Sequence, residues 1–480
     1  MNPHKQSPSP PRQTWTLVLA GLAAFMTALD TLVVTTALPV LRVDLHSSLS
    51  GLEWTVNAYN LAFACLLLTG AALGDRFGRR RMFAFGLGAF TAASAASAVA
   101  PTVQALIISR AMQGAGAAIV TPLTLTLISE AFPAEKRGVA IGMWGGIAGL
   151  AVAAGPLVGG AVVSGIDWHW IFWLNVPIGL ALIPAALARL SESHGPRPHL
   201  DLPGLALALT GTLGLTWGLV RANTLGWTSP EVLATMIAGA ALLSAFVAWE
   251  RHTSNPMVSP ALFRNRSFTA ANGVSFFMYA GLFGALFLMS QLLQTALGNS
   301  PLQAGLRLLP WSFPPMIFAP IAGALASRFG NRPFMVLGLA MQAAGLAWVA
   351  AIAGPGVDYL ELGVAFTIAG IGTSLCFPTV ADAIMSSVPR EEAGVASGAN
   401  SAIRELGGVA GVAILASVFI HNGGYSGPHA FMHGFTPAVW VAVGMSGIGV
   451  LAAGLTSGRK QSELQPGSSL NAAVPEPQAA

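Results

Sequence analysis

Charged residues are scarce in this sequence of 480 residues. Asp, Glu, Lys and Arg together make up 9% of it, and hydrophobic residues make up 54%. A soluble domain carries about 25% charged residues, because polar side chains must cover its surface. The composition therefore predicts a polytopic membrane protein. The net charge of +4 is spread over short loops and forms no basic face, so no nucleic-acid partner is expected.

Residues that carry most enzyme and metal chemistry are also rare or isolated. The chain has three lysines and no GxxxxGK[ST] stretch, which excludes a Walker-type ATPase site. The two cysteines, Cys65 and Cys376, lie in apolar runs and form no disulfide framework, so both are expected to be buried thiols. Nine histidines include no HExxH pair. We expect no metal site and no cofactor.

Long apolar segments recur along the whole chain. About 20 apolar residues are needed for a helix to cross a bilayer. Fourteen segments meet this need, and they predict an all-α protein with fourteen transmembrane helices, at residues 15–40, 52–74, 82–100, 104–128, 138–163, 170–189, 204–222, 230–249, 268–292, 303–325, 334–353, 359–383, 394–420 and 435–456.

Lys and Arg lie on one side of these segments. With the N-terminus inside, the cytoplasmic segments carry 18 of the 23 basic residues, the opposite side carries two, and three lie within spans. Because basic residues collect on the cytoplasmic side, the bias predicts that both termini are cytoplasmic.

The sequence also repeats itself. The loop after the second span reads AALGDRFGRRRMFAFG from Ala71, and the loop after the tenth reads GALASRFGNRPFMVLG from Gly323. This register relates two six-helix halves, a known architecture of transporters. The predicted units are a disordered tail (1–14), the N-terminal half (15–189), a linker (190–202), two inserted helices (203–250), a loop (251–267), the C-terminal half (268–456) and a second disordered tail (457–480).

Two ionisable residues lie at matching depth inside the N-terminal half. Asp30 lies roughly 22 Å from the inner end of the first span, and Arg110 roughly 9 Å from the outer end of the fourth. A charge pair or a shared water-filled cavity between them is geometrically possible. Intramembrane charges are costly and usually functional. The alternatives are a structural acid held by its neighbours and an arginine that snorkels to the outer interface.

Two further stretches carry residues that bend helices or pair charges. The fifth span contains Gly155, Pro156, Gly159 and Gly160, which predict a bend or a tightly packed helix pair. In the loop after the second span, Asp75 can pair with Arg79 or meet a helix N-terminus. Such a cluster could form in one state and open in another, or the arginines could serve only to orient the chain.

Many stretches of the chain resemble the major facilitator superfamily, and in particular its fourteen-spanner drug:proton antiporter family (EmrB/QacA type). They are LDTLVVTTALPVL from Leu29, LEWTVNAYNL from Leu52, LGDRFGRR from Leu73, SRAMQGAGAA from Ser109, AGPLVGG from Ala154, WHWIFWLNVPIG from Trp168, ALFRNRSF from Ala261 and SPLQAGLRLLP from Ser300. They cover nearly the whole chain.

The resemblance implies a major-facilitator-type fold and proton-driven export of amphipathic organic compounds such as drugs or antibiotics by alternating access, in the cytoplasmic membrane of a bacterium. It implies that Asp30 and Arg110 handle the proton and that Gly155, Pro156, Gly159 and Gly160 form the antiporter hinge. The inner gating loop would comprise Asp75, Arg76, Gly78 and Arg79. Trp54, Asn57, Tyr59 and Gln113 are candidates for lining the substrate cavity. Whether a periplasmic adaptor takes part is left open.

The C-terminal half departs from this pattern at two places. Ser327 replaces the loop aspartate, so that copy of the loop is expected to lack the charge relay. Glu405 stands where a neutral Gln is expected, beside Arg404 and near mid-membrane. The two are either a structural ion pair or a second proton-coupling or cation-binding site. An uptake permease and a membrane-embedded lipid-modifying enzyme are the alternative functions.

Overall fold

The computed structural model describes residues 10–47, 49–195, 201–253, 256–354, 356–389 and 392–456. The tail predicted at 457–480 lies outside the described residues, as do residues 1–9 of the other. Residues 10–14 begin the first helix instead of ending a disordered tail. Pro10 and Pro11 stand at this helix start, where proline is favoured because it needs no hydrogen-bonded N–H.

The described chain is helical throughout and contains no strand. Its elements are α1 (Pro10–Asp44), α2 (Leu49–Phe77), α3 (Arg79–Ala98), α4 (Val103–Ala131), α5 (Ala134–Gly165), α6 (Trp170–Trp173), α7 (Asn175–Arg189), α8 (Leu202–Leu225), α9 (Pro230–His252), α10 (Pro260–Arg264), α11 (Arg266–Gln291), the π-helical turn η1 (Leu292–Ala296), α12 (Pro301–Arg307), α13 (Leu309–Ser312), α14 (Pro314–Phe329), α15 (Asn331–Ile352), α16 (Tyr359–Ser386), α17 (Ala393–Asn422) and α18 (Pro428–Gly454). The all-α prediction is confirmed.

Twelve helices of the described chain are long and apolar enough to cross a membrane. Helices cover all fourteen predicted spans. Two of these helices, α3 and α5, are not among the twelve that are long and apolar enough. Three arginines begin α3, and Glu135, Lys136 and Arg137 lie in the first turn of α5.

Prolines break two of the predicted spans. The tenth, predicted as one helix over 303–325, is three helices, α12 to α14, with Pro310, Pro314 and Pro315 at the junctions. The sixth is interrupted at Leu174 between α6 and α7, three residues before Pro177. A proline lacks the N–H that would continue the hydrogen-bond ladder, so a helix readily ends one turn before it.

The two tight loops of the internal repeat have the same backbone geometry. Gly78 joins α2 to α3 with a φ of 101°, and Gly330 joins α14 to α15 with a φ of 83°. Residues with a Cβ rarely adopt this left-handed conformation, so glycine is favoured at both positions. The shared geometry supports the predicted register.

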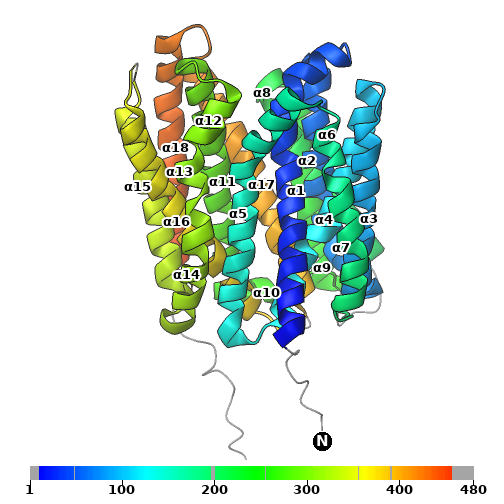
Figure 1. Cartoon of the computed structure of the whole chain (residues 1–480). Helices are drawn as coiled ribbons and strands as arrows, with labels where there is room; N and C mark the ends of the chain where they lie inside the picture. The colour runs from blue at the N-terminus through cyan, green and yellow to red at the C-terminus, as the bar shows by residue number, and fades with distance from the viewer. Residues whose placement is uncertain are drawn as a thin grey trace, which may run out of the picture.

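The helices stand side by side, and α1 begins and α18 ends at one end of the bundle, which lies at the bottom of Figure 1. We call it the lower end. α8 and α9 form a hairpin, and α8 packs against both α2 and α17. The inserted helices therefore contact both halves.

The halves meet along two seams in the lower part of the bundle. Between α5 and α14, a Cβ added to Gly138 would lie 2.7 Å from the Gly323 carbonyl oxygen, and one added to Gly142 would lie 2.5 Å from that of Ala319. Between α2 and α17, Gly398 approaches the Ala71 Cβ too closely for a side chain to be added. Small residues let these backbones approach closely, so the lower end is closed.

Replacing Gly323 by Val tests the α5–α14 seam, because an added Cβ would lie 2.0 Å from the Gly138 carbonyl oxygen. Overpacking costs about 1–3 kcal/mol, so we expect a lower midpoint of thermal unfolding for the purified protein. Gly444→Val is the matched control, since a Cβ at Gly444 meets no atom within 4 Å. Equal midpoints for the two variants would contradict the seam.

Candidate functional site

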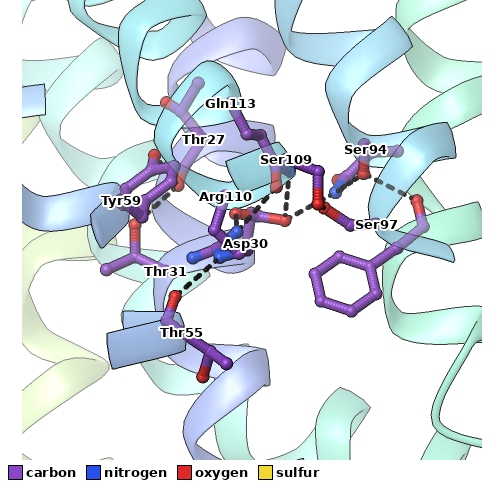
Figure 2. A network of polar contacts seen from close by, with 12 residues as sticks. Thr27, Asp30, Thr31, Thr55, Tyr59, Ser94, Ser97, Ser109, Arg110 and Gln113 are labelled. Atoms are coloured by element: carbon purple, nitrogen blue, oxygen red, sulfur yellow. Dashed lines mark hydrogen bonds and ion pairs between the residues drawn. The ribbon is translucent and has the colours of Figure 1, made fainter. Parts of the chain in front are cut away.

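Asp30 of α1 and Arg110 of α4 form an ion pair in the interior of the N-terminal half. Arg110 Nη1 donates to Asp30 Oδ2 at 2.5 Å. Asp30 is 2% exposed and Arg110 1% exposed, so neither reaches the surface. The structure thus brings together the two residues whose depths matched in the sequence, and Arg110 does not snorkel (Figure 2).

Two amides complete the surroundings of the Asp30 carboxylate. Gln113 Nε2 donates to Oδ1 at 2.7 Å, and Asn175 Nδ2 donates to the same oxygen at 2.8 Å. Asn175 also donates to Ser94 Oγ at 3.0 Å, which ties α7 and α3 to the site. The carboxylate and its amide partners thus come from α1, α4 and α7, with α3 behind Asn175.

Close helix packing lets Arg110 reach its other partners. Gly114 lies one turn along α4, and a Cβ there would lie 2.3 Å from the carbonyl oxygen of Tyr59 on α2. At this short separation Arg110 Nε donates to Thr55 O at 3.3 Å, and its guanidinium lies 4.3 Å from the centre of the Tyr59 ring. Cation–π contact and hydrogen bonding together stabilise the buried charge.

The chemistry open to this site is proton transfer. A carboxylate in a low-dielectric interior stays ionised when a cation and hydrogen-bond donors surround it, and it binds a proton once they are withdrawn. Movement of α4 relative to α1 would therefore change which charges and donors surround the Asp30 carboxylate.

The glycine stretch of α5 lies against this site. A Cβ added to Gly155 would lie 2.6 Å from Leu32 Cβ, two residues beyond Asp30 on α1. Gly159 is buried, Gly160 is partly buried, and Pro156 lies within the same helix. Close packing of α5 on α1 is observed at Gly155, next to Asp30, whereas Gly160 faces Leu302 of α12.

A second charge cluster lies at the lower end and centres on Arg79. Arg79 Nε donates to Asp75 Oδ1 at 2.8 Å, and Arg79 Nη1 contacts Glu130 Oε1. Ser193 Oγ donates to Glu130 Oε2 at 2.5 Å, which joins the segment after α7 to the cluster. Asp75 and Arg79 pair as the sequence suggested, and Glu130 is a third member.

The cluster also meets the opposite half. A Cβ added to Gly394, in the first turn of α17, would lie 2.1 Å from Asp75 Oδ1. An anion near the N-terminus of a helix is stabilised by the helix dipole. Gly78 packs beside Glu192, and the Arg76 guanidinium lies 5.2 Å from the Phe77 ring centre. The predicted gating loop thus touches α4, the linker and α17.

In the C-terminal half, an asparagine stands at the position that corresponds to Arg79. Shifting by the 252-residue repeat places Ser327, Asn331 and Asp382 where Asp75, Arg79 and Glu130 stand. Asn331 Nδ2 donates to Asp382 Oδ2 at 2.9 Å. The geometry of the contact is repeated, but its cation is replaced by an amide.

Among the described residues, no hydrogen bond joins Arg404 or Glu405 of α17 to the Asp30 network. Arg404 is 9% exposed, and its guanidinium lies 5.0 Å from the ring centre of Tyr279 on α11. Arg404 Nε and Glu405 Oε1 are 3.8 Å apart. This is an ion pair but too long for a hydrogen bond.

The four candidate cavity residues divide into two pairs. Tyr59 and Gln113 belong to the Arg110–Asp30 network. Trp54 and Asn57 instead face α8, where with Trp217 and Arg221 they line a small depression between α2 and the inserted hairpin. The Trp54 and Trp217 ring centres are 5.1 Å apart.

Sequence reasoning did not identify Asn175, Ser94 or Glu130. Asn175 stands alone among apolar residues in WHWIFWLNVPIG, and that isolation could have marked it. Glu130 is the only acid in α4 and lies near its lower end. Nothing local marks Ser94, whose role depends on how α3 packs against α7.

A duplicated helical bundle with a buried ion pair in one half defines the class of multi-pass membrane carriers. A family model described as Major Facilitator Superfamily matches residues 20–257 and 272–475. The chain belongs to this superfamily, and the resemblance of the sequence to it is confirmed at the level of the superfamily.

Relatives of the chain include proteins of two Streptomyces species. The chain is 34% identical over 405 residues to the tetracenomycin C resistance and export protein of Streptomyces glaucescens, covering 83% of this chain and 74% of that protein. It is 33% identical over 441 residues to the puromycin resistance protein pur8 of Streptomyces alboniger, covering 90% and 86%.

The fold has solved counterparts. The proton:xylose symporter XylE, bound to 6-bromo-6-deoxy-D-glucose, superposes with a TM-score of 0.65 at 16% identity, covering 92% of this chain and 94% of that one. At this identity the likeness concerns the fold alone.

A double-mutant cycle on Arg79→Gln and Glu130→Gln tests the lower-end cluster. Arg79→Gln leaves Asp75 and Glu130 without their cation, and Glu130→Gln leaves Arg79 paired with Asp75 alone. We therefore expect a coupling free energy of about 1–3 kcal/mol in detergent unfolding titrations. The control cycle uses the partly exposed pair Arg221 and Glu231, 3.4 Å apart, for which we expect below about 1 kcal/mol. Similar couplings in both cycles would refute a special role for Arg79.

Proposed function

We propose that this protein is a proton-coupled secondary exporter of amphipathic organic compounds such as drugs or antibiotics, working by alternating access. The observation that carries the proposal is the Asp30–Arg110 pair, which is enclosed by Gln113 and Asn175 and has no contact with the surface. Relatives named for resistance and export support the direction of transport.

The proposed cycle uses the two halves as moving bodies. When the lower end opens, α5 and α1 move together because Gly155 packs on Leu32, and the surroundings of Asp30 change. A proton bound from one side is then released to the other. One proton moving down a 100 mV potential supplies about 2.3 kcal/mol, which is enough for more than a tenfold concentration gradient.

The proposal includes location and topology. Both termini lie in the cytoplasm of a bacterium, the protein sits in the cytoplasmic membrane, and α3 and α5 span it together with the twelve apolar helices, giving fourteen. The lower end, with Asp75, Arg79 and Glu130, is then the cytoplasmic gate. Its partners are the organic substrate, protons and lipid.

Asp30→Asn tests proton coupling directly. We expect the variant to insert and fold. An amide cannot take up and release a proton, so we expect its proton-driven efflux to be abolished. The assay measures dye and antibiotic efflux in cells lacking their main exporters, with and without an uncoupler.

Asp358→Asn is the matched control, because Asp358 caps α16 through Leu360 N, and Asn caps helices equally well. Undiminished uncoupler-sensitive efflux from well-expressed Asp30→Asn would refute the proposal. Transport measured in inside-out and in right-side-out vesicles gives its direction. Uptake into the cell instead of efflux would favour a permease.

A further inference from the structure

The inserted hairpin of α8 and α9 contacts both halves towards the end of the bundle at the top of Figure 1, which we call the upper end. On the side of the N-terminal half, the ring centre of Trp217 in α8 lies 5.1 Å from that of Trp54 in α2. On the side of the C-terminal half, the indole N–H of Trp227, in the turn after α8, donates to Ser417 Oγ of α17. Each half is thus joined to the hairpin through one tryptophan.

These two contacts lie well above the α2–α17 seam. In the seam, Leu67 of α2 and Ala402 of α17 belong to one apolar cluster. Ser417 lies roughly 22 Å beyond Ala402 along α17, and Trp54 lies roughly 20 Å before Leu67 along α2. At that height both helices contact the hairpin, which therefore connects the two halves there.

On the opposite side of the bundle the halves touch each other directly. A Cβ added to Gly149 of α5 would lie 2.9 Å from Pro315 Cβ of α14, and one added to Gly160 would lie 3.8 Å from Leu302 of α12. Direct contact on this side thus continues from the lower seam up to α12. The two sides of the bundle hold the halves together in different ways.

Polar and backbone contacts make the hairpin one unit. Glu231 of α9 accepts a hydrogen bond from Trp217 Nε1 at 3.1 Å and lies 3.4 Å from Arg221 Nε of α8. A Cβ added to Gly239 of α9 would lie 2.5 Å from Leu215 N of α8, so the two backbones approach closely. We therefore expect α8, α9 and the turn between them to move together.

The two tryptophan contacts of the hairpin differ in strength. The Trp54–Trp217 pair combines ring contact with the burial of apolar area between α2 and α8. Trp227 contributes one hydrogen bond to Ser417, and the net contribution of a single hydrogen bond is smaller than that of a buried aromatic pair. When the spacing of α2 and α17 changes, the Trp227–Ser417 contact is therefore the one that breaks.

We propose that the inserted hairpin is a strap across the upper parts of α2 and α17, and that the Trp227–Ser417 hydrogen bond is its releasable end. In this structure the lower end is closed and the hydrogen bond is made. In alternating access the upper ends approach each other when the lower end opens. The strap therefore stabilises the lower-closed state. This inference rests on the alternating access of the proposed function and names an element that regulates it.

Spin-label distances across the lower end of the purified full-length protein test the strap. Labels are attached at Arg81→Cys in α3 and Arg332→Cys in α15, because both positions are exposed and belong to different halves. The native Cys65 and Cys376 are buried and do not compete for the label. A short label distance reports the lower-closed state, and a longer one reports the lower-open state.

Trp227→Phe and Ser417→Ala are each expected to raise the ratio of lower-open to lower-closed molecules about 5-fold, because each removes one net hydrogen bond. The double variant should match the single variants, since both substitutions remove the same contact. Trp249→Phe is the matched control. Its indole donates to Asp201 within the hairpin, so its loss should leave the ratio unchanged.

Three outcomes would overturn the strap: unchanged ratios in both single variants, additive shifts in the double variant, or an equal shift in Trp249→Phe. Dye and antibiotic efflux by the unmodified protein separates this result from the exporter proposal. Uncoupler-sensitive efflux without the expected shifts would overturn the strap and leave the exporter intact. The expected shifts without any efflux would contradict the exporter alone.

Discussion

The ion pair between Asp30 and Arg110 imposes the strongest constraint on the N-terminal half. Two charges removed from water are stable only when each is paired and its remaining hydrogen-bonding groups are satisfied. Three helices meet this need: α4 supplies Gln113, α7 supplies Asn175 and α2 supplies the Thr55 carbonyl. A shift of any of these helices alters the electrostatic surroundings of the carboxylate, so the site is sensitive to conformation.

Glycines of α5 make close helix contacts both near the ion pair and at the lower end of the bundle. On α5, Gly155 packs on α1 beside the ion pair, whereas Gly138 and Gly142 of the same helix form the lower seam with α14. Opening of the seam and displacement near Asp30 therefore involve one helix. The Asp75–Arg79–Glu130 cluster, against Gly394 of α17, closes the same end by charge.

Much of this arrangement is predictable from the sequence where the signal is local or periodic. Apolar length gave the helices, the loop repeat gave the two halves, and depth along two spans paired Asp30 with Arg110. Partners that depend on tertiary packing were not predictable: Glu130 reaches Arg79 across 51 residues, and Asn175 reaches Asp30 across 145. Trp54 and Asn57 face α8 because the inserted hairpin packs on α2, and the sequence predicted this hairpin but not the helix against which it packs.

In the proposed mechanism, Asp30 gains and loses a proton as its contact with Arg110 changes. Infrared difference spectroscopy of the reconstituted protein, recorded between high and low pH, detects the carbonyl band of a protonated carboxyl group directly. We expect a band that appears on acidification, shifts with isotope-labelled aspartate, and is absent from Asp30→Asn. An identical aspartate band in Asp30→Asn and in the unmodified protein would rule out this role of Asp30.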